Sequence, residues 1–125
     1  MKITRSVAEY TRFRSTLDGP SGSRLAFVPT MGAMHEGHRS LMTLARSLGD
    51  VVAVSIFVNP LQFGPSEDYA RYPRPLDDDL EVCEAEGVDA VFVPSVSDLY
   101  PPGRQVTIDA GALGSVLEGR SRPGH

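Results

Sequence analysis

A near-continuous apolar run constrains the fold more than any other feature of the sequence. The eight residues from Val51 to Val58 read Val-Val-Ala-Val-Ser-Ile-Phe-Val, and most of them are β-branched. A strand of this composition is typical of a parallel sheet that is covered on both faces. Before it, a short apolar strand at 25–28 is followed by apolar residues at helical spacing over 35–48. Strand, helix and strand in this order predict a right-handed βαβ unit.

The remaining segments extend the α/β pattern. Strands are predicted at 1–4 and 88–94, with an edge strand at 105–109. Helices or helical turns are predicted after Ser6, which can cap the first of them, and at 76–86, 96–99 and 111–118, with a loop-like end at 119–125. We therefore expect one α/β domain, built on a Rossmann-like parallel sheet with flanking helices.

Composition narrows the classes of partner. The chain has 125 residues and a formal net charge of −4, whereas nucleic-acid-binding modules are usually basic. No stretch approaches the roughly 18 apolar residues of a membrane-spanning helix. Cys83 is the single cysteine, so no intrachain disulfide can form, and we expect a cytoplasmic protein without nucleic-acid or membrane partners.

The segment between the first predicted strand and its helix carries the clearest functional pattern. Residues 29–38, which we call the elbow, read Pro-Thr-Met-Gly-Ala-Met-His-Glu-Gly-His. A helix start gathers free backbone N–H groups and the positive end of the helix dipole, which favours anionic phosphate. His35 and His38 stand three residues apart and would share one face there. We expect both imidazoles to donate to ATP phosphates and to assist a departing pyrophosphate.

Two other interpretations of this histidine pair remain open. In the first, the histidines cap the helix or lie on the surface without any ligand. In the second, they share a zinc ion, although no third ligand stands at a convincing spacing, since Cys83 belongs to a distant helix.

Polar residues follow the central strand at the edge where the elbow also emerges. Asn59 and Gln62 lie just beyond it, and the carboxyl ends of parallel strands meet at one cleft. Their amides suit a hydroxyl or carboxylate, whereas Asn-Pro is equally a turn opener. Tyr72 lies in a polar loop that could cover the cleft, and Arg122 is a cationic candidate near the chain end.

Two further features have simpler interpretations. His125, the final residue, is like Arg122 a cationic candidate near the end of the chain, and a flexible tail is the simpler interpretation of both. The acidic run 77–79 resembles a metal site, but we interpret it as the solvated first turn of a helix, where acidic residues favour the helix dipole.

At this point the sequence resembles a known family. The elbow and the segment 54–64, which reads Val-Ser-Ile-Phe-Val-Asn-Pro-Leu-Gln-Phe-Gly, are similar to the pantothenate synthetase (pantoate–β-alanine ligase) family of HIGH-type nucleotidyltransferases. Shorter matches continue in order at 72–74, 77–80, 86–89, 117–119 and 122–125. In this resemblance, His35-Glu36-Gly37-His38 is the HIGH motif.

The resemblance implies a two-step reaction that requires ATP and Mg²⁺. Pantoate first reacts with ATP to give pantoyl adenylate and pyrophosphate, and β-alanine then displaces AMP to give pantothenate. His38 would be the proton donor and His35 would help to hold the phosphates. The ATP-binding residues would be Met31, Gly32, Ala33, Met34, His35, Glu36, Gly37 and His38. Pantoate and β-alanine would contact Gln62, Pro29 and Met31, and the site would be lined further by Asn59, Tyr72, Arg122 and His125.

Members of that family are longer than this chain. They carry a further ATP-binding segment and a smaller C-terminal domain beyond the point that corresponds to His125. We therefore expect 1–125 to be an incomplete N-terminal nucleotide- and pantoate-binding domain, inactive alone, with an unpaired sheet edge and exposed apolar surface. A homodimer is also expected. The alternatives are a catalytically silent binding fragment and another HIGH-type adenylyltransferase.

Overall fold

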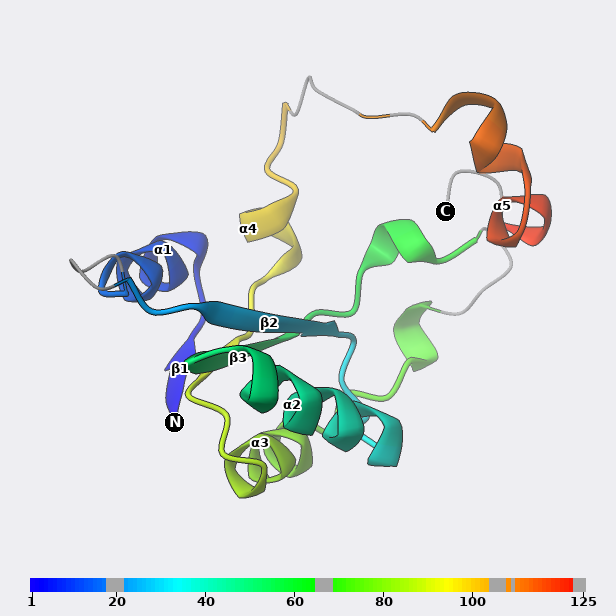
Figure 1. Ribbon diagram of the computed structural model, residues 1–125. Helices are drawn as coiled ribbons and strands as arrows, with labels where there is room; N and C mark the ends of the chain where they lie inside the picture. Colours follow the sequence, from blue (N-terminus) through cyan, green and yellow to red (C-terminus); the bar gives the residue numbers. More distant parts are fainter. Residues whose placement is uncertain (18–21, 65–68, 104–107, 109, 123–125) are drawn as a thin grey trace.

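The described part of the chain is built around one parallel sheet. The computed structural model describes residues 1–17, 22–64, 69–103, 108 and 110–122. Four strands pair in the order β1-β4-β3-β2, and every pair is parallel. Their bounds are β1 Lys2–Thr4, β2 Leu25–Thr30, β3 Val51–Ile56 and β4 Ala90–Phe92 (Figure 1). The predicted α/β class and parallel sheet are confirmed.

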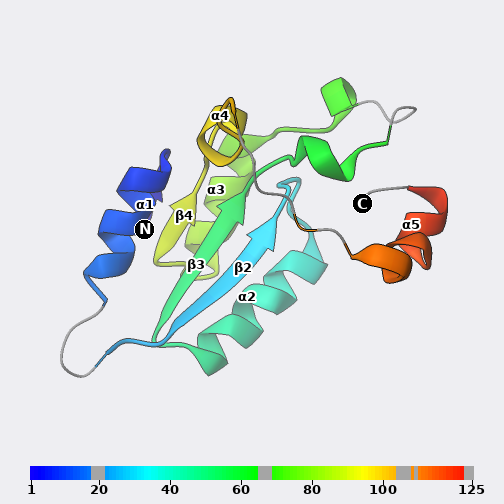
Figure 2. The same ribbon diagram turned by 90° about the horizontal axis from the view of Figure 1, so that it is seen from above.

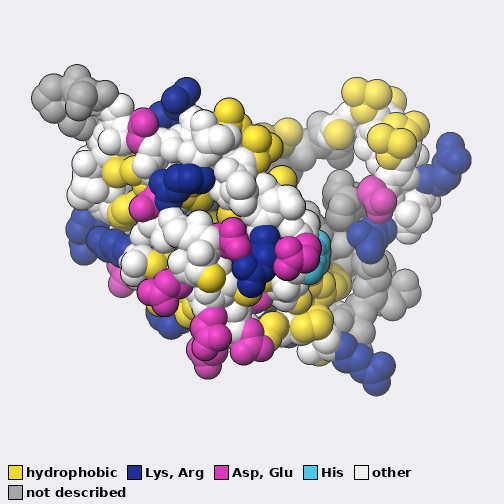
Figure 3. Space-filling view, turned by 60° about the horizontal axis from the view of Figure 1, so that its bottom comes forward, with side chains coloured by type: hydrophobic (Ala, Val, Ile, Leu, Met, Phe, Trp, Pro, Cys, Tyr) yellow, Lys and Arg dark blue, Asp and Glu magenta, His cyan; other side chains and the backbone are white. Residues whose placement is uncertain are grey.

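Helices cover both faces of this sheet. Helix α2 (Glu36–Leu48) and helix α3 (Leu76–Ala85) lie on one face, and α1 (Val7–Ser15) lies on the other (Figures 1 and 2). Charged side chains of both signs gather over the outer surface of α2 and α3 (Figure 3). The shorter elements are α4 Val96–Leu99, α5 Glu118–Ser121 and the 3₁₀ turns Pro60–Gln62, Tyr69–Arg71 and Gly111–Ser115.

The core lies between the sheet and the pair α2 and α3. Met42 of α2 has no exposed surface and packs with Val52 and Val54 of β3. Cys83 of α3 joins the same cluster and is also fully buried. The apolar periodicity of 35–48 therefore predicted the buried face of α2, which fixes this helix against β2 and β3.

The carboxyl ends of β2 and β3 emerge at one edge of the sheet. The two strands pair in register from Leu25 opposite Val51 to Thr30 opposite Ile56, so both end at the same level (Figure 2). The elbow leaves β2 there, and the 3₁₀ turn Pro60–Gln62 follows β3 at the same edge. The parallel sheet therefore places the elbow and the turn Pro60–Gln62 side by side, although they lie far apart in the sequence.

Within the described residues, β2 is an edge strand of the sheet. The surface beside its outer edge is apolar. A groove of about 540 Å³ runs between β2 and the outer stripe of α2. Leu44 is 54% exposed in this groove, and Leu41, Leu48 and Phe27 are also exposed. Among the described strands, none pairs with the outer side of β2, so this flank is an exposed apolar surface of the kind that the sequence predicts. Among the described helices, none is both long and apolar enough to cross a membrane.

Several element bounds differ from the predicted ones. β2 continues to Thr30 because it pairs with β3 along its whole length, and β4 spans three residues instead of the seven of 88–94. β3 ends at Ile56 rather than at position 58, and α2 begins at Glu36. A helical turn, α5, stands where a loop was predicted. The edge strand predicted at 105–109 falls almost wholly outside the described residues.

Alanine substitutions of Met42 and Leu44 should have different effects on stability, because the two residues lie on the buried and the exposed face of α2. Met42→Ala opens a cavity in a fully buried site and should lower the free energy of unfolding by about 2–5 kcal/mol. Leu44→Ala removes a half-exposed side chain from the same helix and should cost less than about 1 kcal/mol. Urea denaturation followed by circular dichroism measures both, and equal losses would contradict the assigned register of α2.

Candidate functional site

The elbow reverses the chain between β2 and α2 through two left-handed residues. Gly32 has φ +79° and Ala33 has φ +51°. The hydroxyl of Thr30 donates to the carbonyl of Ser55 at 2.7 Å and accepts from the amide of Gly32 at 3.2 Å. The end of β2 is thereby fastened to β3 at the point where the turn begins.

A buried carboxylate holds the other side of this turn. Asp79 of α3 is 2% exposed, and its two oxygens accept from the amides of Ala33 at 2.9 Å and Met34 at 2.7 Å. The interpretation of 77–79 as a solvated acidic turn is therefore wrong for Asp79, although Asp77 and Asp78 are exposed. Helical spacing contained the signal, because Asp79 stands three residues after Leu76 and four before Cys83, on the apolar face.

The neighbourhood of Asp79 is tightly filled. A Cβ atom added to Gly32 would lie 2.7 Å from Oδ2 of Asp79 and 3.1 Å from a methyl group of Ile56. Burial, and secondarily the charge of Asp79, raises the pKa of Cys83 to about 11. The only cysteine is thus a protonated core residue at neutral pH, without the thiolate character that nucleophilic or metal-binding cysteines need.

The two histidines cap α2 and engage one another. His35 is the N-cap residue rather than a member of the helix, and its Nδ1 accepts from the amide of Gly37 at 3.1 Å. Its own amide donates to Nδ1 of His38 at 3.3 Å, and the two ring centroids lie 4.0 Å apart. The capping interpretation is therefore confirmed for His35, and it does not exclude a ligand on the remaining ring nitrogens.

Because of this capping, few backbone amides at the start of α2 remain free to bind an anion. The amides of His35, Gly37 and His38 already donate within the elbow, and those of Ala33 and Met34 donate to Asp79. The expectation of a free cluster of backbone amides is wrong for these five residues. Because each Nδ1 accepts a hydrogen bond, the neutral rings carry their proton on Nε2, which becomes the available donor.

The charge state of His38 is set by its surroundings. Partial burial lowers the pKa of His38, the neighbouring His35 lowers it further, and the carboxylate of Asp79 opposes both effects. His38 is consequently a neutral Nε2–H donor at neutral pH. An approaching anion would raise its pKa and allow the ring to take up a proton.

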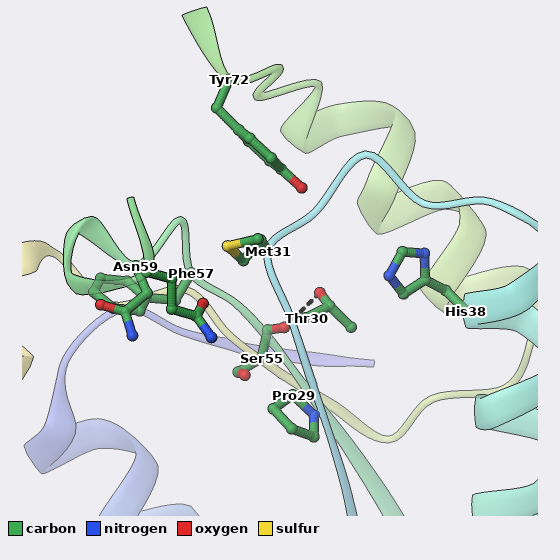
Figure 4. A pocket seen from close by; sticks show the side chains of 9 residues that line it. Pro29, Thr30, Met31, His38, Ser55, Phe57, Asn59 and Tyr72 are labelled. Carbon is green, nitrogen blue, oxygen red and sulfur yellow. Dashed lines mark hydrogen bonds between the residues drawn. The ribbon is translucent and has the colours of Figure 1, made fainter. Parts of the chain in front are cut away.

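His38 faces a pocket of about 420 Å³ at the carboxyl edge of the sheet (Figure 4). It comes from the start of α2, whereas Asn59 comes from the segment after β3 (Figure 4). The lining contains six of the sequence-predicted residues: Pro29, Met31, His38, Asn59, Gln62 and Tyr72. It also contains Thr30, Ser55 and Phe57, which sequence reasoning missed. Ser55 was detectable as the one polar residue of an otherwise apolar strand.

Other predicted site residues lie away from this lining. His35 is exposed at the helix start, and Met34 packs against the core. The side chain of Glu36 forms an ion pair with Arg39 at 3.4 Å on the surface. Arg122 lies within 3.8 Å of Glu118 near α5. The remaining elbow residues, Gly32, Ala33 and Gly37, shape the backbone, and His125 lies outside the described residues.

Asn59 combines a structural role with its position in the pocket. Its amide oxygen accepts from the amide of Leu61 at 3.0 Å, which caps the 3₁₀ turn, and from the hydroxyl of Tyr100 at 3.1 Å. The turn interpretation of Asn-Pro is thus confirmed, and the side-chain nitrogen is the part with which Asn59 would meet a ligand. Within the described residues, no three His, Cys, Asp or Glu side chains gather as a metal site.

Comparison with known proteins agrees with this geometry. The family model described as pantoate-beta-alanine ligase matches residues 2–125. The chain belongs to this family. The pantothenate synthetase of Acidothermus cellulolyticus is 58% identical over 123 residues, and that of Aquifex aeolicus is 61% identical over 104 residues. These matches cover 98% and 83% of this chain, but only 39% and 37% of the two relatives.

Solved structures of the family share the fold. A pantoate-beta-alanine ligase from Francisella tularensis, complexed with beta-gamma ATP and beta-alanine, superposes with a TM-score of 0.91 at 43% identity. The pantothenate synthetase of Thermus thermophilus superposes with a TM-score of 0.84 at 44% identity. Each covers 100% of this chain, which spans 48% and 44% of the respective structures.

Replacing Gly32 by alanine should destabilise the elbow by more than backbone strain alone. Gly87 has a similar φ of +70°, but a Cβ atom added there would meet open space, so Gly87→Ala isolates the cost of a left-handed alanine, about 1–2 kcal/mol. Gly32→Ala should cost about 1–3 kcal/mol more, because its Cβ meets Asp79. Urea denaturation of both variants measures the difference, and equal costs would show that Asp79 does not fill this space.

The pKa of His38, followed by NMR, should lie below the ordinary histidine value of about 6.5. As the pH falls, the unfolded chain then protonates at this position before the folded chain does. The contribution of His38 to stability is therefore complete above about pH 6.5 and is lost as the pH falls through the folded-state pKa of His38. His35→Asn keeps a good capping residue but removes the neighbouring positive charge, and should raise the pKa of His38. An unchanged or lower value would contradict the assigned coupling.

Proposed function

We propose that this chain supplies the ATP- and pantoate-binding site of an ATP-dependent, AMP-forming pantoate–β-alanine ligase. The observation that carries the proposal is the pocket at the carboxyl edge of the sheet, where His38 from the elbow meets Gln62 from the segment after β3. One wall thus offers a donor for phosphate, and another offers an amide for a hydroxy acid. The neighbour from Francisella tularensis, complexed with beta-gamma ATP and beta-alanine, supports ATP and β-alanine as ligands.

In the proposed first step, a carboxylate oxygen of pantoate attacks the α-phosphorus of ATP. The bond between that phosphorus and the bridging oxygen breaks, giving pantoyl adenylate and pyrophosphate. Negative charge builds up on the phosphate oxygens, where the Nε2–H of His38 would donate. As that charge raises the pKa of the ring, His38 can hold the proton that the departing pyrophosphate takes.

In the proposed second step, the amine of β-alanine attacks the activated carbonyl and expels AMP. Gln62 would hold pantoate by its amide and then orient β-alanine, while Pro29 and Met31 provide the apolar part of the same wall. Asn59 and Tyr72 would line the nucleotide side of the pocket.

The rest of the elbow would contact ATP less directly. Gly32, Ala33, Met34, Glu36 and Gly37 set the course of the backbone beside the triphosphate, and His35 would hold phosphate through its Nε2. Arg122 and His125 would complete the site from the end of the chain, as the resemblance implies. Mg²⁺ would reach this site bound to the phosphates of ATP, as it commonly does at phosphate sites.

The whole protein would be larger than the site described above. Residues 1–125 would form the N-terminal nucleotide- and pantoate-binding domain of a cytoplasmic homodimer, as the resemblance implies. Because the chain spans only 39% of the Acidothermus relative and 37% of the Aquifex relative, we propose that 125 residues alone bind ligands without turnover. Ligands bound by half of a site lose the contacts that exclude water.

Pantoate-dependent exchange of labelled pyrophosphate into ATP tests the function, in the protein extended to the length of its relatives. His38→Ala removes the donor to the phosphates and should lower the exchange rate by roughly 10²–10⁴-fold. Ser47→Ala changes an exposed residue at the far end of α2 and should leave the rate unchanged. Full exchange in His38→Ala would refute the role of His38, and no exchange in the parent protein would refute the ligase assignment.

A further inference from the structure

We propose that Asp79 is a positioning residue, whose buried carboxylate holds residues 32–34 in the left-handed turn that aims His38 into the pocket. This inference rests on the proposed function only for its catalytic consequence, since the positioning itself is a property of the free chain. Asp79 does not line the pocket and would act through the elbow.

Asp79 binds the backbone of the elbow directly. Both oxygens of Asp79 accept backbone amides, from Ala33 at 2.9 Å and from Met34 at 2.7 Å, across 46 and 45 residues of sequence. Hydrogen bonds from amides to an ionised carboxylate are stronger than neutral ones, and a carboxylate has enough acceptor positions for both. A buried carboxylate without such donors would carry a large desolvation cost, so this arrangement specifies where the amides must point.

These hydrogen bonds hold Gly32 and Ala33 in a left-handed backbone conformation. Ala33 has φ +51°, which an alanine adopts only at a cost, and Gly32 before it has φ +79°. There is no room for the carboxylate and a side chain on residue 32 together, because a Cβ there would lie 2.7 Å from Oδ2. The glycine and the aspartate therefore form one packed unit, and the carboxylate offsets the strain at Ala33.

The turn held by Asp79 is connected to the imidazole of His38 through His35. Met34 is followed directly by His35, whose amide donates to Nδ1 of His38 at 3.3 Å. Fixing the amides of Ala33 and Met34 thus fixes the residue that orients the ring of His38. The carboxylate also acts on His38 through space, by favouring its protonated form against the neighbouring His35. Asp79 would accordingly influence both the direction and the charge of the pocket donor.

The experiment compares Asp79→Asn with Asp78→Asn in the 125-residue chain. Both variants remove one negative charge from the same helical turn, but Asp78 is exposed and Asp79 is buried against the elbow. The amides of Ala33 and Met34 reach different oxygens of Asp79, and asparagine has an NH₂ group in place of one of them, so one amide would face a donor instead of an acceptor. In Asp79→Asn, one of the amides of Ala33 and Met34 should exchange with solvent roughly tenfold faster or more.

The pKa of His38, read by NMR in the same samples, should fall in Asp79→Asn and stay unchanged in Asp78→Asn. Packing alone would not produce this shift, since asparagine is nearly isosteric with aspartate. Unchanged exchange of both amides, or an unchanged His38 titration, would overturn the proposal. If Asp79→Asn does not fold, the parent chain still decides, because unprotected amides at Ala33 and Met34 would overturn it and protected ones support it.

The catalytic consequence is measured separately, in the protein extended to the length of its relatives. Asp79→Asn should lower kcat of pantoate-dependent pyrophosphate exchange, with the KM for pantoate unchanged, because Gln62 is held by another element. An unchanged kcat would overturn the catalytic part of the proposal. If the parent protein shows no exchange, the proposed function fails, and the two NMR measurements still judge the positioning role of Asp79.

Discussion

Two backbone amides that meet one buried carboxylate hold the site together. The amides of Ala33 and Met34 donate to Asp79, which ties α3 to the junction between β2 and α2. This tie compensates for the left-handed conformation at Ala33 and helps to anchor the start of α2. The position of His38 depends on that start, since a backbone amide beside the turn orients its ring.

The parallel sheet supplies the second constraint. Because β2 and β3 run in register and end at the same level, the elbow and the segment around Asn59 and Gln62 must share one edge. The core lies between the sheet and the buried faces of α2 and α3, and it reaches the same strand end, since Val54 and Ile56 belong to it and Ser55 between them lines the pocket. Alternate residues of one strand thus serve packing and the pocket. The exposed apolar groove between β2 and α2 shares Pro29 with the pocket and Val28 with the core.

Periodicity was sufficient to predict most of the fold. The apolar run from Val51 and the helical spacing over 35–48 gave β3, α2 and the parallel sheet, since both patterns report directly on burial. Asp79 was missed because its charge resembles that of the exposed Asp77 and Asp78, although its spacing from Leu76 and Cys83 places it on the apolar face of α3. The amides that it binds lie 46 and 45 residues away in the sequence and could not be foreseen. The site was partly predictable, as sequence order marks strand ends but does not show which side chains, such as Ser55, turn toward the pocket.

Titration of ATP into the ¹⁵N-labelled chain tests most directly whether the elbow forms the ligand site. Chemical-shift changes should concentrate on the elbow and on the segment that carries Asn59 and Gln62, and they should saturate together at high ATP concentration. In His38→Ala the same changes should require a higher ATP concentration. Shift changes confined to the apolar groove between β2 and α2, or none at the elbow, would show that ATP does not bind at the elbow.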